Sequence, residues 1–210
     1  MKKILAAGLV SALIFGGAIA SEHEHEDIKE EVVEIGQKAS KKLLKTLVSE
    51  LKKAMQEGGP YKAVEVCSQK ALKLTEKVAK EEGVEIKRTS FKYRNPKNAP
   101  DEYEKEALEY FEKALKEKGQ LPKYYVQKVN ENEYRYYMPL KVKAVCLTCH
   151  GDPKHMDKKL LEKIRALYPN DKAVGYKEGD FRGVIRVSIT KEALEKHEKH
   201  EKEEKEEHHH

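Results

Sequence analysis

The chain has 210 residues, of which 38% are charged, with 42 Lys and Arg against 37 Asp and Glu. The formal net charge of +5 falls to +3 without Lys2 and Lys3, and charges of both signs are interspersed. We therefore find no basic cluster of the kind that binds nucleic acid. The length favours one domain, with or without helical appendages.

The first twenty residues predict an export signal. Lys2 and Lys3 precede an apolar run from Ile4 to Ile19, and Ala18 to Ala20 has the small residues of a cleavage site. We expect residues 1–20 to be a cleaved signal peptide and the mature protein to be periplasmic or otherwise exported. A retained N-terminal anchor is the alternative, although the run is short for a membrane-spanning helix.

Two helices are expected after the signal. Apolar residues recur at three- and four-residue steps from Val32 to Ala54, with Asp27 as the N-cap. The glycine pair at 58–59 ends this helix, and Pro60 suits the first turn of the next. The second helix has an apolar face from Ala63 to Val78.

Strands and further helices follow in mixed order. Asp101 with Glu104 predicts a capping box at the start of a helix that Gly119 closes. The other elements expected are strands at 84–92, 123–129, 133–145 and 184–190 and a helix at 158–167. On the last strand, Ile185, Val187 and Ile189 are expected to point inward. This order predicts an α+β domain over residues 21–190. Residues 191–210 form a charged, helix-prone or disordered tail with little apolar surface to bury.

The most specific motif is Cys146-Leu147-Thr148-Cys149-His150. Two cysteines with this spacing, followed by histidine, are typical of c-type haem attachment, in which each thiol adds to one vinyl group and the histidine ligates the iron. Export agrees with this interpretation, because haem c is attached outside the inner membrane. A zinc site, a redox dithiol and chance remain alternatives. A zinc site needs further ligands at suitable spacing, and a redox dithiol needs a βαβ pattern; we find neither.

Cys67 is the third cysteine, and it lies on the apolar face of the second expected helix, between Ala63 and Ala71. A free cysteine in this position is often a small buried hydrophobe. The alternative is a thiolate ligand to iron, because flanking alanines would let a flat porphyrin approach. The residues alone leave both interpretations open.

Several stretches together resemble a family of c-haem-binding domains of exported bacterial proteins and sensor ectodomains, of cyanobacterial type. The stretches are Ala63 to Cys67, Arg88 to Asp101, Cys146 to Gly151, Tyr168 to Tyr176 and Gly179 to Val187. The resemblance implies a PAS-like α+β fold, with an antiparallel sheet, N-terminal helices and flanking helices around one haem c. It implies attachment through Cys146 and Cys149, with His150 and Cys67 as the axial ligands of the iron.

Other side chains near such a haem are also candidates. Alternative sixth ligands are Met138, expected to pack in the sheet, and His155 and Met156, expected in a solvated loop. The candidate partners of the haem propionates are Arg88, Arg94 and Arg182. Ordinary surface salt bridges would explain these arginines equally well.

Three functions follow from these expectations. Thiolate and imidazole ligands on the iron would favour a low reduction potential. We therefore favour a protein that passes one electron to a redox partner protein. A redox or small-gas sensor, in which the cysteine ligand is displaced, is the alternative, and no output domain follows in this sequence. A haem enzyme, such as a peroxidase or small-molecule reductase, comes third, since no acid/base constellation accompanies the motif. We expect neither nucleic-acid binding nor an integral membrane protein after signal cleavage.

Overall fold

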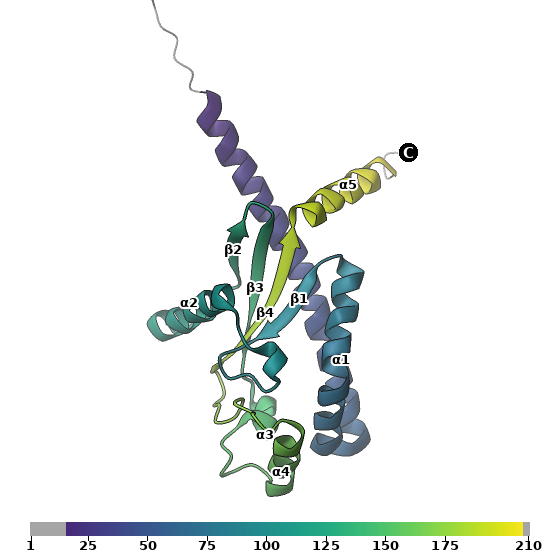
Figure 1. Ribbon diagram of the computed structural model, residues 1–210, viewed down its shortest axis with the longest axis vertical. Coiled ribbons are helices and arrows are strands. Elements are labelled where there is room, and N and C mark those ends of the chain that lie inside the picture. Colours follow the sequence, from purple (N-terminus) through teal and green to yellow (C-terminus); the bar gives the residue numbers. More distant parts are fainter. Residues whose placement is uncertain (1–15, 208–210) are drawn as a thin grey trace, which may run out of the picture.

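The computed structural model describes residues 16–207, which form an α+β fold of helices around a four-stranded antiparallel sheet (Figure 1). The elements in chain order are α1 (Gly16–Glu82), β1 (Glu85–Thr89), η1 (Pro96–Asn98), α2 (Glu102–Lys118), β2 (Tyr125–Asn130), β3 (Glu133–Lys141), η2 (Ala144–Cys146), α3 (Leu147–His150), α4 (Lys158–Leu167), β4 (Phe181–Thr190) and α5 (Lys191–Glu207). The expected α+β class with an antiparallel sheet is confirmed.

Helix α1 is bent into two limbs at Gly58 and Gly59, where the backbone leaves the helical region. Gly59 has φ 65°, a left-handed conformation that glycine adopts at no steric cost. The predicted break at this pair is therefore confirmed. The predicted start at Asp27 is wrong, because the first limb is helical from Gly16 onwards.

Residues 1–15 of the expected signal peptide lie outside the described residues, as do the closing histidines 208–210. Residues 16–20 belong to the first limb of α1. Across residues 16–207, we find no helix with the length and apolar character needed to cross a membrane.

The sheet has the strand order β1-β4-β3-β2. Helix α1 packs on one of its faces and α2 on the other. On β4, Ile185, Val187 and Ile189 are fully buried against α1, which confirms the predicted inward side. On β3, Tyr136 packs on the same face, whereas Tyr137 is fully buried on the opposite face, under α2. The core is therefore double-sided.

Helix α2 has the predicted capping box between Asp101 and Glu104, and Gly119 ends it in the left-handed conformation. Glu104 is fully buried and also binds two cations of the sheet. Its carboxylate accepts hydrogen bonds from Lys87 Nζ at 2.6 Å and Arg186 Nε at 3.1 Å. An ion-pair network thus fixes α2 to strands β1 and β4.

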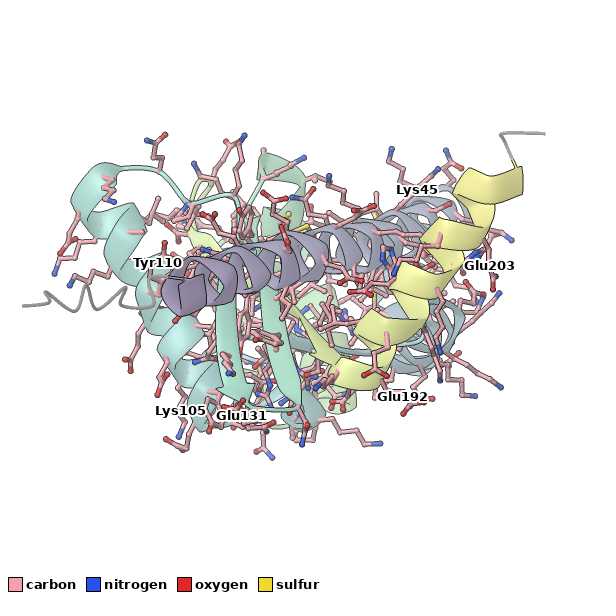
Figure 2. The ribbon with its side chains drawn as sticks, turned by 90° about the horizontal axis from the view of Figure 1, so that it is seen from above. Lys45, Lys105, Tyr110, Glu131, Glu192 and Glu203 are labelled. Atoms are coloured by element: carbon pink, nitrogen blue, oxygen red, sulfur yellow. The ribbon has the colours of Figure 1, made fainter. Side chains whose placement is uncertain are left out.

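Helix α5 continues directly from β4 and contacts α1. Leu194 is buried in the core between α1 and the sheet, so the start of the expected tail belongs to the packed domain. Elsewhere the surface is charged, and side chains such as Lys45, Glu131 and Glu192 point outward (Figure 2).

Gly36 lies where α1 packs closely on Tyr136 of β3. A Cβ atom added there would lie 2.1 Å from Cγ of the buried Tyr136. We expect Gly36→Ala to lower the free energy of unfolding by about 1–3 kcal/mol, because overpacking outweighs the gain in helix propensity. Urea denaturation of this variant and of the exposed control Glu34→Ala measures the effect. An unchanged or higher stability of Gly36→Ala would contradict the packing described here.

Candidate functional site

A cavity of about 310 Å³ lies between the second limb of α1, the end of β1, the start of β4 and the cysteine motif. Its lining includes seven residues singled out from the sequence, namely Cys67, Arg88, Arg94, Cys146, Cys149, His150 and Arg182. Segments from most of the chain thus meet at one site, near the end of the molecule that carries α3 and α4 (Figure 1).

The motif itself forms two short helical turns. Strand β3 ends at Lys141, so the predicted strand to Val145 is too long and does not run directly into Cys146. Cys146 ends η2 and Cys149 lies in α3. Residues three apart in a helical turn are neighbours, so both thiols have access to the same cavity. All three cysteines of the chain are free.

His150 is held by the loop that precedes β4. Its Nδ1 lies 2.7 Å from the carbonyl oxygen of Ala173, and its own carbonyl oxygen accepts from the amide of Tyr176 at 2.9 Å. A carbonyl only accepts hydrogen bonds, so Nδ1 carries the proton and Nε2 keeps a free lone pair. This is the arrangement that orients metal-binding histidines. Burial and the nearby Arg94 lower the pKa of His150 to about 3.

Arg94 ties the motif to the same loop. Its guanidinium forms an ion pair with Asp171 at 3.0 Å and donates to the carbonyl oxygens of Cys149 at 2.6 Å and Ala173 at 3.2 Å. Arg94 therefore holds the backbone of Cys149, which precedes His150, and the backbone of Ala173, which the His150 side chain contacts. Asp171 was not singled out from the sequence, although it lies in one of the stretches that carry the family resemblance.

Cys67 faces the cavity from the second limb of α1 and is exposed there. Its interpretation as a packed core residue is therefore wrong. The neighbouring Ala63 and Ala71 also line the cavity, so no bulky side chain from these positions covers the thiol. Desolvation by the surrounding protein raises the pKa of Cys67, and Arg88 and Arg94 act against this rise.

The three alternative ligands do not line the cavity. Met138 packs against the core of the sheet, and His155 is exposed beside Asp152, both as expected. Met156 is buried with Leu160 of α4, so its expected place in a solvated loop is wrong.

Arg88 and Arg182 lie where the sheet meets the cavity. Nε of Arg88 is buried and has no hydrogen-bond partner within residues 16–207. Arg182 Nη1 donates to the carbonyl oxygen of Lys92 at 3.2 Å, and its guanidinium packs over the ring of Tyr176. Burial lowers the pKa of both arginines. Gly183, which follows Arg182, has no room for a side chain, because an added Cβ would lie 2.4 Å from the carbonyl oxygen of Thr89.

A model of the Tll0287-like family, described as Tll0287, matches residues 20–190. The chain belongs to the Tll0287-like family. Among solved structures, it is similar to the crystal structure of the cyanobacterial haem protein Tll0287, with 26% identity and a TM-score of 0.52. That similarity covers 80% of this chain and 96% of the Tll0287 chain. No curated protein matches the sequence significantly.

The Tll0287-like match includes all seven residues of the cavity that were predicted as site residues. It confirms the family resemblance found in the sequence. The zinc site and the redox dithiol, two of the alternatives to haem, gain no support from the geometry of the described residues. Within residues 16–207, no three His, Cys, Asp or Glu side chains form a metal-binding group, and the strand pairs are antiparallel.

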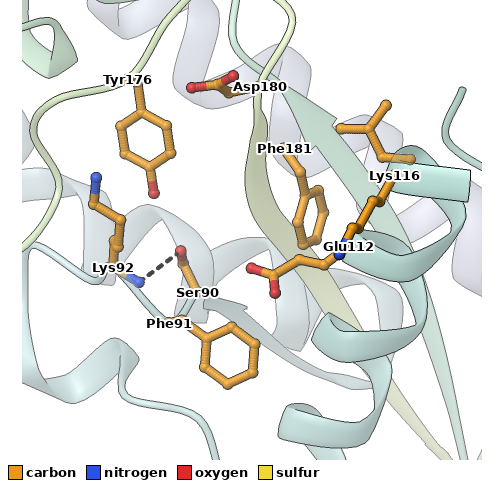
Figure 3. A pocket seen from close by; sticks show the side chains of 9 residues that line it. Ser90, Phe91, Lys92, Glu112, Lys116, Tyr176, Asp180 and Phe181 are labelled. Carbon is orange, nitrogen blue, oxygen red and sulfur yellow. Dashed lines mark hydrogen bonds between the residues drawn. The ribbon is translucent and has the colours of Figure 1, made fainter. Parts of the chain in front are cut away.

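A second hollow of about 350 Å³ lies between α2 and the start of β4 (Figure 3). Ser90 lines both spaces, and Tyr176 contributes to the second while its ring packs edge-on against His150. Glu112 and Lys116 of α2 also line the second hollow. The second hollow contains none of the predicted site residues of this Tll0287-like chain.

Proposed function

We propose that the chain binds one haem c in the cavity and passes single electrons in an exported compartment. The observation that carries the proposal is the meeting of Cys146, Cys149 and His150 in one cavity that Cys67 enters from another wall. The related protein of known structure, Tll0287, is a haem protein, which supports haem as the occupant.

The residues of the cavity fit a haem. Its apolar lining includes Leu51, Met55 and Leu140, which suit a porphyrin ring. Two free thiols at the spacing of the haem motif would form the covalent bonds. Among the described residues, the lining contains arginines and no carboxylate, which suits a ligand with two carboxylates.

His150 Nε2 and the Cys67 thiolate are the proposed axial ligands. The bound haem would supply one-electron chemistry, and a thiolate ligand would keep its potential low. The chain's own part is to hold the imidazole in one tautomer through Ala173 and to brace the motif through Arg94 and Asp171. With both axial positions filled by the chain, the resting site would offer no open position for a substrate.

Export and domain limits belong to the same proposal. Residues 1–20 are the proposed signal peptide, 21–190 the haem domain and 191–210 the tail, which places the protein in the periplasm or another exported compartment. The family match at residues 20–190 supports these limits. A redox partner protein is the proposed partner.

Absorption spectra of the oxidised, reduced and carbon-monoxide-treated reduced protein test the proposed function. An electron-transfer protein is expected to stay low-spin in both states and to ignore carbon monoxide. Binding of carbon monoxide by the reduced protein would instead favour the alternative, a small-gas or redox sensor in which Cys67 is displaced. Turnover of peroxide or of a small nitrogen or sulfur compound would favour an enzyme.

The acid response of the haem-free protein is a further expectation. The pKa of His150 is about 3 when folded and about 6.5 when unfolded, so the unfolded chain takes up the proton first as pH falls. As pH falls from about 6.5 to 5, His150 should therefore lower the free energy of unfolding by up to about 1.4 kcal/mol per pH unit. Urea denaturation at several pH values in this window gives the free energy of unfolding as a function of pH. The free energy of unfolding should fall less steeply with falling pH in His150→Asn than in the wild type. Equal slopes in both proteins would contradict the buried neutral imidazole.

A further inference from the structure

The three arginines of the cavity differ in whether they already have a carboxylate partner. Arg88, Arg94 and Arg182 are the charged residues in the lining of the cavity, within the described part of the chain. Arg94 is neutralised by Asp171 at 3.0 Å and uses further donors on two backbone carbonyls. Two guanidinium charges therefore remain without a carboxylate in the lining, and a haem carries two propionates.

Arg88 has the clearest need for an anion. Its Nε is buried and lacks a partner among residues 16–207, and a buried donor without a hydrogen bond destabilises the folded state. Arg88 lies in β1, which pairs with β4, and Arg88 and Arg182 are close enough for their charges to repel. An anionic ligand between them would relieve both effects.

Arg182 also keeps donors for a ligand. Its two described hydrogen bonds, to Lys92 O at 3.2 Å and to Tyr176 Oη at 3.5 Å, both use Nη1. A guanidinium has five N–H donors in a planar fork that matches a carboxylate. The packing of Arg182 over Tyr176 holds this fork in place.

We propose that Arg88 and Arg182 bind the two haem propionates and that Arg94 does not. The inference rests on the proposed haem site and deepens it by setting the direction of the ring. In haem the vinyl and propionate groups lie on opposite edges. The vinyl edge would then meet Cys146 and Cys149, and the propionate edge would meet the paired ends of β1 and β4.

Resonance Raman spectra of the haem-loaded protein test this assignment through the propionate bending bands, which respond to hydrogen bonding. We expect these bands to shift in Arg88→Gln and in Arg182→Gln, and the reduction potential to fall because a positive charge near the iron is lost. The thiolate bands should stay unchanged. Arg88→Lys, which keeps the charge, should show a smaller shift and guards against a folding defect.

Two variants serve as controls. Arg165→Gln, on the exposed side of α4, should change nothing, and Arg94→Gln should alter the iron–histidine bands without moving the propionate bands. Loss of the thiolate bands in Arg88→Gln with unmoved propionate bands would make Arg88 a partner of Cys67 and overturn the proposal. So would propionate bands that move only in Arg94→Gln. A wild type without haem would instead refute the proposed function itself.

Discussion

Cys67→Ala is expected to abolish the low-spin thiolate spectrum of the haem-loaded protein and to let carbon monoxide bind the reduced iron. Cys67 is exposed to the cavity from the second limb of α1, and the alternative ligands Met138, His155 and Met156 do not line it. None of these three alternative ligands is therefore in place to substitute for the thiolate. The potential should rise by on the order of 100 mV, within the roughly 0.8 V over which axial ligands act.

Spectroscopy and potentiometric titration of three variants separate ligation from packing. Thr148→Ala is the matched control, since Thr148 lines the same cavity without a thiol and should leave the spectrum unchanged. Cys67→His should restore a six-coordinate iron with a nitrogen ligand. If Cys67→Ala keeps the wild-type spectrum, Cys67 is not a ligand, and the proposed iron site is wrong.

Glu104→Gln is expected to lower the free energy of unfolding by about 3 kcal/mol or more. The fully buried carboxylate pairs with Lys87 at 2.6 Å and with Arg186 at 3.1 Å. Arg186 is itself buried, and its other carboxylate partner, Glu85, is exposed. Loss of the charge on residue 104 would leave two cations with little compensation.

Glutamine isolates the charge, because Gln at this position still accepts in a capping box. Urea denaturation should show Glu109→Gln, an exposed change on the same helix, to be nearly neutral. The double variant Glu104→Gln with Arg186→Met should recover part of the loss, since a buried charge is removed together with its partner. A neutral Glu104→Gln would show that the network does not stabilise the fold.

Local signals predicted the elements that local physics determines. The glycine pair at 58–59, the capping box of α2 and the inward residues of β4 were all confirmed. The start of α1 was missed because residues 21–26 offer no helix-breaking residue, so the N-cap signal at Asp27 did not compete with continued helix. The burial of Tyr137 was missed because α2, which covers it, comes from an earlier part of the chain.

The features of the site also fall into those that a short sequence pattern predicts and those that depend on contacts between distant residues. The spacing of Cys146, Cys149 and His150 is contained in five residues and was visible at once. The brace of Arg94 and Asp171 joins residues far apart in sequence, and pairing of this kind has no local signature. The exposure of Cys67 depends on a cavity whose walls come from α1, β1, β4 and the motif, so helical periodicity alone could not decide between a packed core residue and a ligand.

Mass spectrometry of the denatured protein, produced together with a c-haem assembly system, tests the central claim most directly. We predict that the chain carries the mass of one haem, and that this mass is lost when both Cys146 and Cys149 are replaced by alanine. A chain of unmodified mass, or a haem that acid and solvent remove from the wild type, would contradict covalent attachment at this site.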